Sequence, residues 1–201
     1  MKRFFSSFGK MGKDVILRPL SKIVNTGNIS IGNSVIVDDF VFINGGKRTE
    51  IKNFVHIASF VSITGGGELI IEDFSGISSG CRIFTGNDDY SGKSLTGPTI
   101  PDAYRNVIRS HVHIKKHVVV GANSVILPGV VIEEGACVGA NSLVKTDLKP
   151  WTIYAGSPAK PIRVRPKELI YKYEEKLKAE KFDRIGNYIS NNETDFIINY
   201  L

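Results

Sequence analysis

Aliphatic residues recur every six positions along most of this chain. A helix would need spacings of three and four residues, and an ordinary strand alternates every two residues over a short run only. A period of six, repeated in groups of three, predicts a triangular coil of about 18 residues, with a short strand on each side and a turn at each corner. The recurring positions are Ile31, Val37, Ile43, Ile51, Ile57, Ile63, Ile71, Ile77, Ile83, Ile114, Val120, Ile126, Ile132, Val138 and Val144.

A small or β-branched residue follows most of these positions four residues later, as at Val35, Ser75 and Cys81. The recurring aliphatic residues are expected to point into a prism whose coils stack at the strand spacing of about 4.8 Å. Gly, Asn and Asp fall beside the expected corners, where tight backbone angles favour them. The pattern therefore predicts an all-β solenoid, with one domain over residues 1–165 and a second segment over residues 166–201.

Two stretches depart from the repeat. Residues 89–111 break it with Gly, Pro, Ser and polar residues, and we expect a protruding loop beside the functional site. After Pro166 the pattern predicts a C-terminal helix over residues 167–182. Its expected inward face carries Leu169, Ile170, Tyr173 and Leu177, and its expected outward face carries Glu174, Glu175, Lys178 and Lys181. For Phe196–Ile198, docking on a neighbour and fraying both stay open.

Two segments resemble a known family. Residues 120–130 read VGANSVILPGV and residues 154–163 read YAGSPAKPIR, in the order in which hexapeptide-repeat acyltransferases carry similar segments. The resemblance covers roughly residues 15–165 and implies a left-handed parallel β-helix. The left hand comes from the resemblance alone, because parallel crossovers are right-handed as a rule.

Composition limits the other classes of protein. The chain has 201 residues, 42% hydrophobic and 23% charged, which fits one globular domain and excludes a disordered chain or a membrane bundle. Its net charge of +6 suits an anionic partner, but no basic face interleaved with aromatic residues indicates nucleic-acid binding. No apolar run is long enough to span a bilayer, so we expect a cytoplasmic protein without membrane insertion, and two reduced thiols at Cys81 and Cys137.

A prism filled with aliphatic side chains has no internal cavity, so its ligands must bind outside it or between neighbouring prisms. This requirement predicts an oligomer. The resemblance implies a homotrimer with three grooves between subunits, where an acyl-CoA lies along the coils.

The segment Thr85–Tyr90 carries the most informative chemistry. Sugar O-acetyltransferases of the resembling family often read Thr-Gly-any-His-Asp-Tyr here, with the histidine as general base, and this chain has Asp88 in that place. A hydroxyl acceptor needs proton removal as it attacks a thioester, whereas a neutral amine carries its own lone pair. The change from histidine to aspartate therefore indicates an amine acceptor.

Ser79, Asp88, Asp89 and the extended loop resemble the branch of the family that acylates the 4-amino group of nucleotide-linked deoxyamino sugars. In this interpretation Asp89 is the principal catalytic carboxylate, which orients the amine and stabilises the cationic tetrahedral species, and Asp88 supports it. Ser79 forms a hydrogen bond nearby, and Asn87 and Tyr90 are the substrate-binding candidates. The alternative is that adjacent aspartates beside a glycine only shape a turn.

Four histidines could supply a base if one is needed: His56, His111, His113 and His117. His117 is the best candidate because its coil leads into the first family segment, and the alternative is a surface or capping histidine. No pair of histidines has metal-ligand spacing with a third ligand, so no metal site is expected.

The resemblance also indicates where the co-substrate, acetyl-CoA or another short acyl-CoA, would bind. Small residues let an extended pantetheine approach the backbone, and basic residues at the end of the prism would contact the CoA phosphates. The alternative for the basic residues is an ordinary solvated end. The cofactor candidates are Gly121, Ala122, Gly139, Ala140, Ala155, Gly156, Lys160, Arg163 and Arg165.

The leading hypothesis is an acyl-CoA dependent N-acyltransferase for a nucleotide-linked 4-amino-deoxysugar, in which the amine attacks the thioester directly within a ternary complex. Such a product would enter a surface glycan, with lipopolysaccharide, capsule and glycoprotein glycans all open. One alternative is a sugar or polysaccharide O-acetyltransferase with a histidine base. The other is a catalytically silent binding module, against which the YAGSPAKPIR ending argues.

Overall fold

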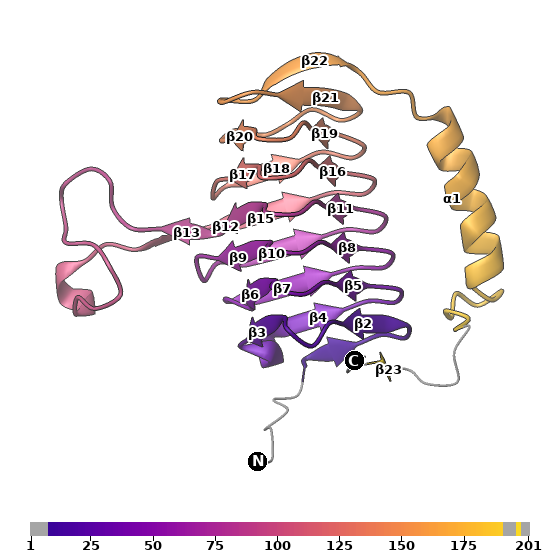
Figure 1. Ribbon diagram of the computed structural model, residues 1–201, viewed down its shortest axis with the longest axis horizontal. Coiled ribbons are helices and arrows are strands. Elements are labelled where there is room, and N and C mark those ends of the chain that lie inside the picture. Colours follow the sequence, from indigo (N-terminus) through magenta and orange to yellow (C-terminus); the bar gives the residue numbers. More distant parts are fainter. Residues whose placement is uncertain (1–7, 191–195, 198–201) are drawn as a thin grey trace.

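The computed structural model describes residues 8–190 and 196–197 as a prism of stacked coils (Figure 1). Each coil adds one short strand to each of three sheets, and all strand pairings within the coils are parallel. Ile51, for example, pairs with Ile31 in the preceding coil and with Ile71 in the next one. The predicted solenoid is thereby confirmed.

The three sheets form the three faces of the prism, and we name them A, B and C. Sheet A contains β1 (Lys10–Met11), β4 (Ile29–Ile31), β7 (Arg48–Ile51), β10 (Glu68–Ile71), β15 (His111–Ile114) and β18 (Val130–Ile132). Sheet B contains β23 (Phe196–Ile197), β2 (Val15–Leu17), β5 (Ile36–Val37), β8 (His56–Ile57), β11 (Gly76–Ile77), β16 (Val119–Val120), β19 (Cys137–Val138), β21 (Thr152–Ala155) and the antiparallel β22 (Lys160–Val164). Sheet C contains β3 (Lys22–Val24), β6 (Phe42–Asn44), β9 (Ser62–Thr64), β12 (Arg82–Phe84), β17 (Val125–Ile126) and β20 (Leu143–Val144), and a 3₁₀ turn (Thr26–Asn28) follows β3.

The core consists of the residues that the six-residue period selects. None of the fifteen recurring aliphatic side chains is more than 2% exposed, and the small residues four positions later, such as Val35, Ser75 and Cys81, are buried with them. Burial of this continuous aliphatic column supplies the main stabilisation of the prism, because each short strand by itself would be unstable in water.

The corners differ from the prediction in one respect. Left-handed backbone angles occur at Asn123 and Asn141, as expected, but also at Phe54, Phe74 and His117, which have φ values of 56°, 61° and 59°. A bulky residue strains the backbone in this region. Here the three rings stack in one column, with centroids 4.9 Å apart for Phe54 and Phe74 and 5.2 Å apart for Phe74 and His117, and this stacking offsets the strain.

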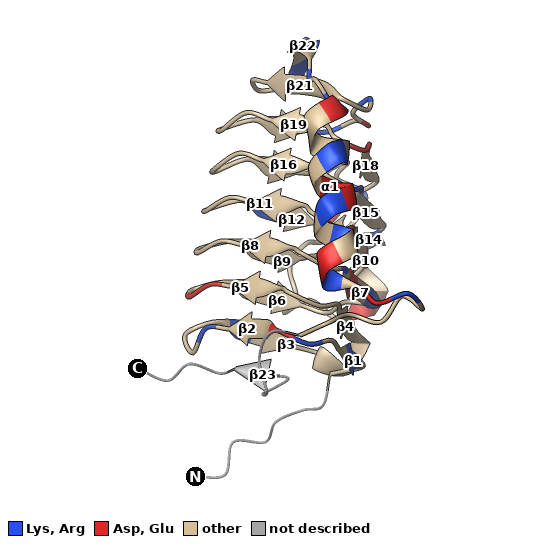
Figure 2. Cartoon of the chain, turned by 90° about the vertical axis from the view of Figure 1, so that its right-hand side faces the viewer, with Lys and Arg blue, Asp and Glu red and all other residues tan. Residues whose placement is uncertain are grey.

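Helix α1 (Glu168–Lys181) runs along the corner between sheets A and B and confirms the predicted helix (Figures 1 and 2). The predicted orientation of the helix is wrong in part. Ile170 and Leu177 are half-buried, as expected, but the other positions are not placed as expected. Leu169 and Tyr173 are both 63% exposed, whereas Glu174 is 8% exposed and faces the prism. Its carboxylate lies 2.6 Å from Lys116 Nζ and 2.6 Å from His117 Nε2. These two polar contacts stabilise an inward glutamate at this corner more than an inward apolar side chain would be stabilised.

Lys178 completes the surroundings of Glu174, with its Nζ atom 2.5 Å from the carboxylate. Burial raises the pKa of Glu174, but the hydrogen bonds from Lys116, Lys178 and His117 outweigh burial and lower that pKa to about 2. The helix is therefore held by a charged carboxylate in a buried cluster.

The remaining features concern the ends and the thiols. Phe196–Ile197 forms β23 and pairs with β2, so this part of the tail docks on the prism, while residue 198 lies outside the described residues. Cys81 and Cys137 are free, as predicted, and burial raises the pKa of both thiols. Among the described helices, none is long and apolar enough to cross a membrane.

Candidate active site

A hairpin loop leaves the prism at the corner between sheets C and A and confirms the predicted excursion (Figure 1). Its base is an antiparallel pair, β13 (Gly86–Asn87) and β14 (Ile108–Arg109), and its far part contains a 3₁₀ turn (Asp102–Tyr104). The loop thus begins three residues before the predicted start and returns to the prism at Arg109.

Asp89 organises the start of this loop. Its side chain is buried, and its carboxylate accepts hydrogen bonds from the backbone amides of Ser91 (2.7 Å) and Lys93 (2.9 Å) and from the hydroxyl of Ser94 (3.3 Å). Hydrogen bonds from Ser91, and then those from Lys93 and Ser94, lower the pKa of Asp89. The carboxylate is therefore ionised at neutral pH and shapes the turn, as the alternative interpretation expects.

Groups of the loop surround the Asp89 carboxylate. Its two oxygens offer about four acceptor sites, and the amides of Ser91 and Lys93 and the hydroxyls of Ser91 and Ser94 all interact with them. The negative charge itself remains, and such a charge can stabilise the positive charge that develops on an amine beside it.

The neighbours of Asp89 are arranged around the same turn. Asp88 accepts a hydrogen bond from the amide of Gly97 across the loop at 3.2 Å. Asn87 lies in β13 and is half-buried, whereas Tyr90 is 88% exposed at the side of the loop. The structure brings Asp88 and Asp89 together in one turn, with the substrate-binding candidates on either side.

Ser79 lies on a different corner of the same chain, in the turn between β11 and β12 that joins sheets B and C. Its side chain is exposed and its carbonyl accepts the amide of Asn123 at 2.9 Å. Ser79 and Asp89 are therefore not neighbours within one chain. They can meet only if the loop of one copy reaches the sheet B to sheet C corner of another.

Four of the predicted CoA contacts share the corner of Ser79, in the coils above it. The glycines there have a packing reason as well, because a Cβ atom on Gly121 would lie 2.6 Å from the amide nitrogen of Ala140, and one on Gly139 would lie 2.9 Å from the Cβ of Ala155. Ala122 is half-exposed and Ala140 is exposed. This corner thus carries a narrow strip of small residues that leads upward from Ser79, with the exposed Asn123 and Asn141 beside it in the turns.

The strip ends at the antiparallel pair β21–β22. Lys160 pairs with Ala155 across these strands, and Gly156 follows Ala155 directly, so these three residues continue the strip. Arg163 is also exposed on β22. Arg165 is separate from them, since its guanidinium donates to the carbonyls of His117 (2.7 Å) and Gly135 (3.0 Å) below helix α1.

The histidines have distinct surroundings. His117 is 5% exposed, stacked on Phe74 and bonded to Glu174, so the structure does not bring it together with Asp88 or Asp89. His56 lies 2.8 Å from the Asp38 carboxylate and His113 lies 2.6 Å from that of Glu72. His111 is exposed at the base of the loop, where β15 begins.

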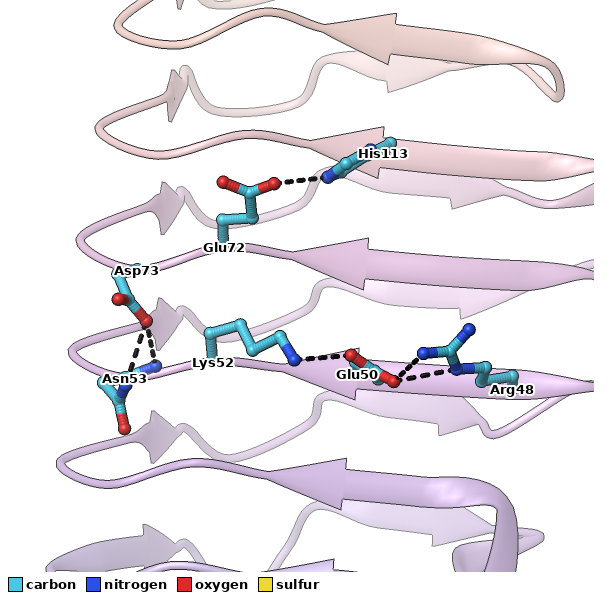
Figure 3. Close-up of polar contacts among 7 residues, drawn as sticks. All are labelled: Arg48, Glu50, Lys52, Asn53, Glu72, Asp73 and His113. Carbon is cyan, nitrogen blue, oxygen red and sulfur yellow. Dashed lines mark hydrogen bonds and ion pairs between the residues drawn. The ribbon is translucent and has the colours of Figure 1, made fainter. Parts of the chain in front are cut away.

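Sequence patterns did not reveal a polar network on the outer face of sheet A (Figure 3). Glu50 bonds to Arg48 and, at 2.6 Å, to Lys52, and hydrogen bonds first from Lys52 and then from Arg48 lower its pKa. Glu72 and His113 form the next rung, beside a pocket of about 380 Å³. Charges here are paired, and the described residues contain no group of three or more His, Cys, Asp or Glu that could hold a metal ion.

Comparisons with known proteins agree with this architecture. The model of the bacterial transferase hexapeptide family (six repeats) matches residues 111–146. The dTDP-4-amino-4,6-dideoxy-D-glucose acyltransferase of Escherichia coli is 41% identical over 164 residues, which are 81% of this chain and 85% of that protein. WbbJ of Escherichia coli, a putative lipopolysaccharide biosynthesis O-acetyl transferase, is 41% identical over 69 residues, 34% of this chain and 35% of that protein.

Among solved structures, AntD, an N-acyltransferase from Bacillus cereus in complex with dTDP and 3-hydroxybutyryl-CoA, superimposes with a TM-score of 0.81 at 42% identity and covers 86% of this chain and 92% of AntD. AntD structures also exist with substitutions at a serine and at an aspartate ten positions later, the same separation as Ser79 and Asp89. The chain therefore belongs to the hexapeptide-repeat acyltransferase family.

Proposed function

We propose that this protein is an acyl-CoA dependent N-acyltransferase that acts on the 4-amino group of a nucleotide-linked 4-amino-4,6-dideoxysugar. The observation that carries the proposal is the 41% identity to the dTDP-4-amino-4,6-dideoxy-D-glucose acyltransferase across 85% of that enzyme. The AntD complexes with dTDP and acyl-CoA support the same two substrates. A cytoplasmic location and a role in surface glycan assembly belong to the same proposal.

The chemistry follows from the ionised carboxylate in the loop. The neutral sugar amine attacks the thioester carbonyl, a C–N bond forms, and the C–S bond breaks as the CoA sulfur leaves. Asp89 orients the amine and stabilises its positive charge, Asp88 holds the turn, and the proton that leaves the nitrogen is taken up by the departing thiolate. The Ser79 hydroxyl donates a hydrogen bond to the reacting carbonyl oxygen, and the neutral amine attacks through its own lone pair, so no histidine base is needed.

The CoA would lie along the strip above Ser79, with Lys160 and Arg163 at its phosphate end. Extended pantetheine needs a surface without protruding side chains, which the strip of Gly121, Ala122 and Ala140 provides. In the same proposal Arg165 has a structural role, because it fixes the segment between β22 and helix α1 to the carbonyls of His117 and Gly135 on the prism.

Assembly as a homotrimer would unite the two halves of the site. The outward side chains of sheet C are mostly uncharged, unlike those of sheet A, which supports burial of sheet C between copies. On the corner that carries Ser79, Phe40 and Phe60 are stacked at 5.0 Å although they are 54% and 57% exposed. On sheet C, the outward positions Val24, Phe42, Asn44, Ser62, Thr64, Phe84, Val125 and Leu143 are uncharged and Lys22 and Arg82 are charged, whereas sheet A presents Arg48, Glu50, Glu68, His111 and His113.

The proposal is tested by thiol release from acetyl-CoA and from 3-hydroxybutyryl-CoA, with dTDP-4-amino-4,6-dideoxyglucose or its 4-hydroxy counterpart as acceptor. Release with the amine alone is the expected result. Release with the hydroxyl sugar would instead support the O-acetyltransferase alternative, for which the exposed His111 at the base of the loop is the available base.

A further inference from the structure

A basic pocket lies at the base of the loop, on the corner between sheets C and A. Its volume is about 520 Å³. It is formed where the turn after β9, the start of β10 and the returning strand β14 meet. The lining residues are Lys47, Gly66, Gly67, Glu68, Arg109, Ser110 and His111.

Close backbone packing fixes the shape of this pocket. Gly65 has a φ of +106°, and a Cβ atom there would lie 2.3 Å from the amide nitrogen of Gly86. A Cβ atom on Gly67 would lie 2.0 Å from the carbonyl oxygen of Ser110. The hairpin therefore rests directly on the glycine turn of the preceding coil, and the pocket is preformed.

The charge of the pocket comes mainly from Arg109. Lys47 Nζ lies 2.7 Å from the carboxylate of Glu68, so these two charges offset one another. The guanidinium of Arg109 lies across Gly66 and forms no hydrogen bond or ion pair with any described residue. An arginine that is held beside bare backbone and lacks a carboxylate partner is suited to bind a phosphate through two parallel hydrogen bonds.

The pocket lies close to the proposed amine site. Arg109 pairs with Gly86 across the hairpin, and Asp89 follows Gly86 by three residues, so the backbones at Arg109 and Asp89 are separated by about 10 Å or a little more. In a nucleotide-linked 4-aminosugar, one hexose ring separates the 4-amino group from the first phosphate. An amine at Asp89 and a diphosphate at Arg109 therefore match the dimensions of one substrate molecule.

We propose that this pocket binds the diphosphate of the nucleotide-linked amino sugar, with Arg109 as the principal contact and Lys47 and His111 beside it. The inference rests on the proposed function. CoA also contains a diphosphate, but its proposed track places that group beside Lys160 and Arg163 on β22, at the end of the prism and several coils away from this pocket. The pocket thus makes Arg109 a determinant of acceptor binding and not of acyl-donor binding.

The test compares Arg109→Gln with Arg184→Gln, which removes an equal charge from an exposed position after helix α1. Calorimetric titration with dTDP and with thymidine measures the part of the affinity that the diphosphate supplies. Arg109→Gln is expected to weaken dTDP binding roughly 10- to 100-fold and to leave thymidine binding unchanged. Arg109→Lys should recover part of the loss, and thermal unfolding should be the same for all variants.

Steady-state kinetics assign the diphosphate to one substrate. The KM for the amino sugar should rise about 10-fold in Arg109→Gln, with kcat and the KM for acyl-CoA close to wild type. Unchanged dTDP binding, or a rise in the KM for acyl-CoA alone, would overturn the inference. If the wild-type protein acylated no amino sugar but bound dTDP through Arg109, the proposed function would fail and the pocket assignment would stand.

Discussion

Helix α1 and the loop of residues 86–109 occupy two corners of the same prism, and they use acidic side chains in different ways. Glu174 of the helix faces the core side and has three basic partners, Lys116, His117 and Lys178. Asp89 of the loop has hydroxyl and amide partners and, within the part of the chain that the structure describes, no basic one. Both carboxylates are ionised, but the negative charge of Glu174 is balanced by neighbouring cations and stabilises structure, whereas the charge of Asp89 has no such balance and is suited to a cationic ligand.

The two corners also differ in how far their aromatic and aliphatic side chains are exposed. The aromatic column below helix α1 is covered, with Phe182 and Tyr188 packed edge-on against Phe54. Along the loop, Tyr90, Leu95, Tyr104 and Ile108 are each at least half exposed. The aromatic column of the helix corner is covered within one chain, whereas the aromatic side chains of the loop corner are exposed, as the proposed substrate site and subunit contact require.

The largest effect is expected from Asp89→Asn. This change keeps the size of the side chain but removes the charge that stabilises the cationic intermediate, so kcat/KM for the amino sugar should fall by about 100-fold. Asp102→Asn, at an exposed site on the same loop, is the matched control and should be near wild type. Equal losses in both variants would mean that loop structure, and not the Asp89 charge, limits the rate.

The opposite result is expected on the helix corner. Glu174→Gln leaves three basic groups without their shared carboxylate and should lower the free energy of unfolding by about 2 kcal/mol, measured by denaturant titration. Glu175→Gln, on the exposed side of the same helix, should change it little. A Glu174 variant with normal stability but reduced kcat would contradict the assignment of a structural role to the helix corner and a catalytic role to the loop corner.

The contribution of Glu174 to the free energy of unfolding should also depend on pH. The pKa of Glu174 is lowered from 4.5 to about 2, and a carboxyl with a lowered pKa contributes stability that is complete above its unfolded-state value. That contribution is lost as the pH falls from about 5 toward 2. The difference in unfolding free energy between wild type and Glu174→Gln should therefore shrink over this interval, and a constant difference would contradict the account.

A smaller effect on catalysis is expected from Ser79→Ala. Loss of one neutral hydrogen bond to the reacting group should reduce kcat by roughly 10-fold, with little change in KM. Ser59 occupies the equivalent turn one coil below, where its carbonyl accepts the amide of Gly80, and Ser59→Ala is the control. If both serine variants behaved alike, the position of Ser79 would carry no catalytic meaning.

The sequence predicts the prism well because its period depends on burial, which acts on every coil in the same way. Ile57 and Ile77 are buried for the same reason, and either could be assigned without the other. The loop could also be predicted, because residues 89–111 break the period, and Asp88 stood out because the resembling enzymes have histidine there. In each case a local departure from a regular pattern carried the information.

Contacts between distant residues could not be predicted in this way. Glu174 faces inward because it bonds to Lys116 and His117, which lie 57 to 58 positions earlier in the chain. The helical pattern alone favours Leu169 and Tyr173 on that face. The pocket around Arg109 depends on a glycine turn more than forty positions earlier, at residues 65–67. Ser79 and Asp89 were grouped by resemblance, and only the fold shows that they occupy separate corners of one chain.

The most direct test of amine-specific acyl transfer is a single reaction that contains equal amounts of the 4-amino and the 4-hydroxy dTDP sugar with acetyl-CoA. Mass spectrometry of the nucleotide sugars then reports which acceptor gains the acyl group. The account predicts an added acetyl mass on the amino sugar and none on the hydroxyl sugar. Acetylation of the hydroxyl sugar at a comparable rate would contradict it and require a general base that Asp88 and Asp89 do not supply.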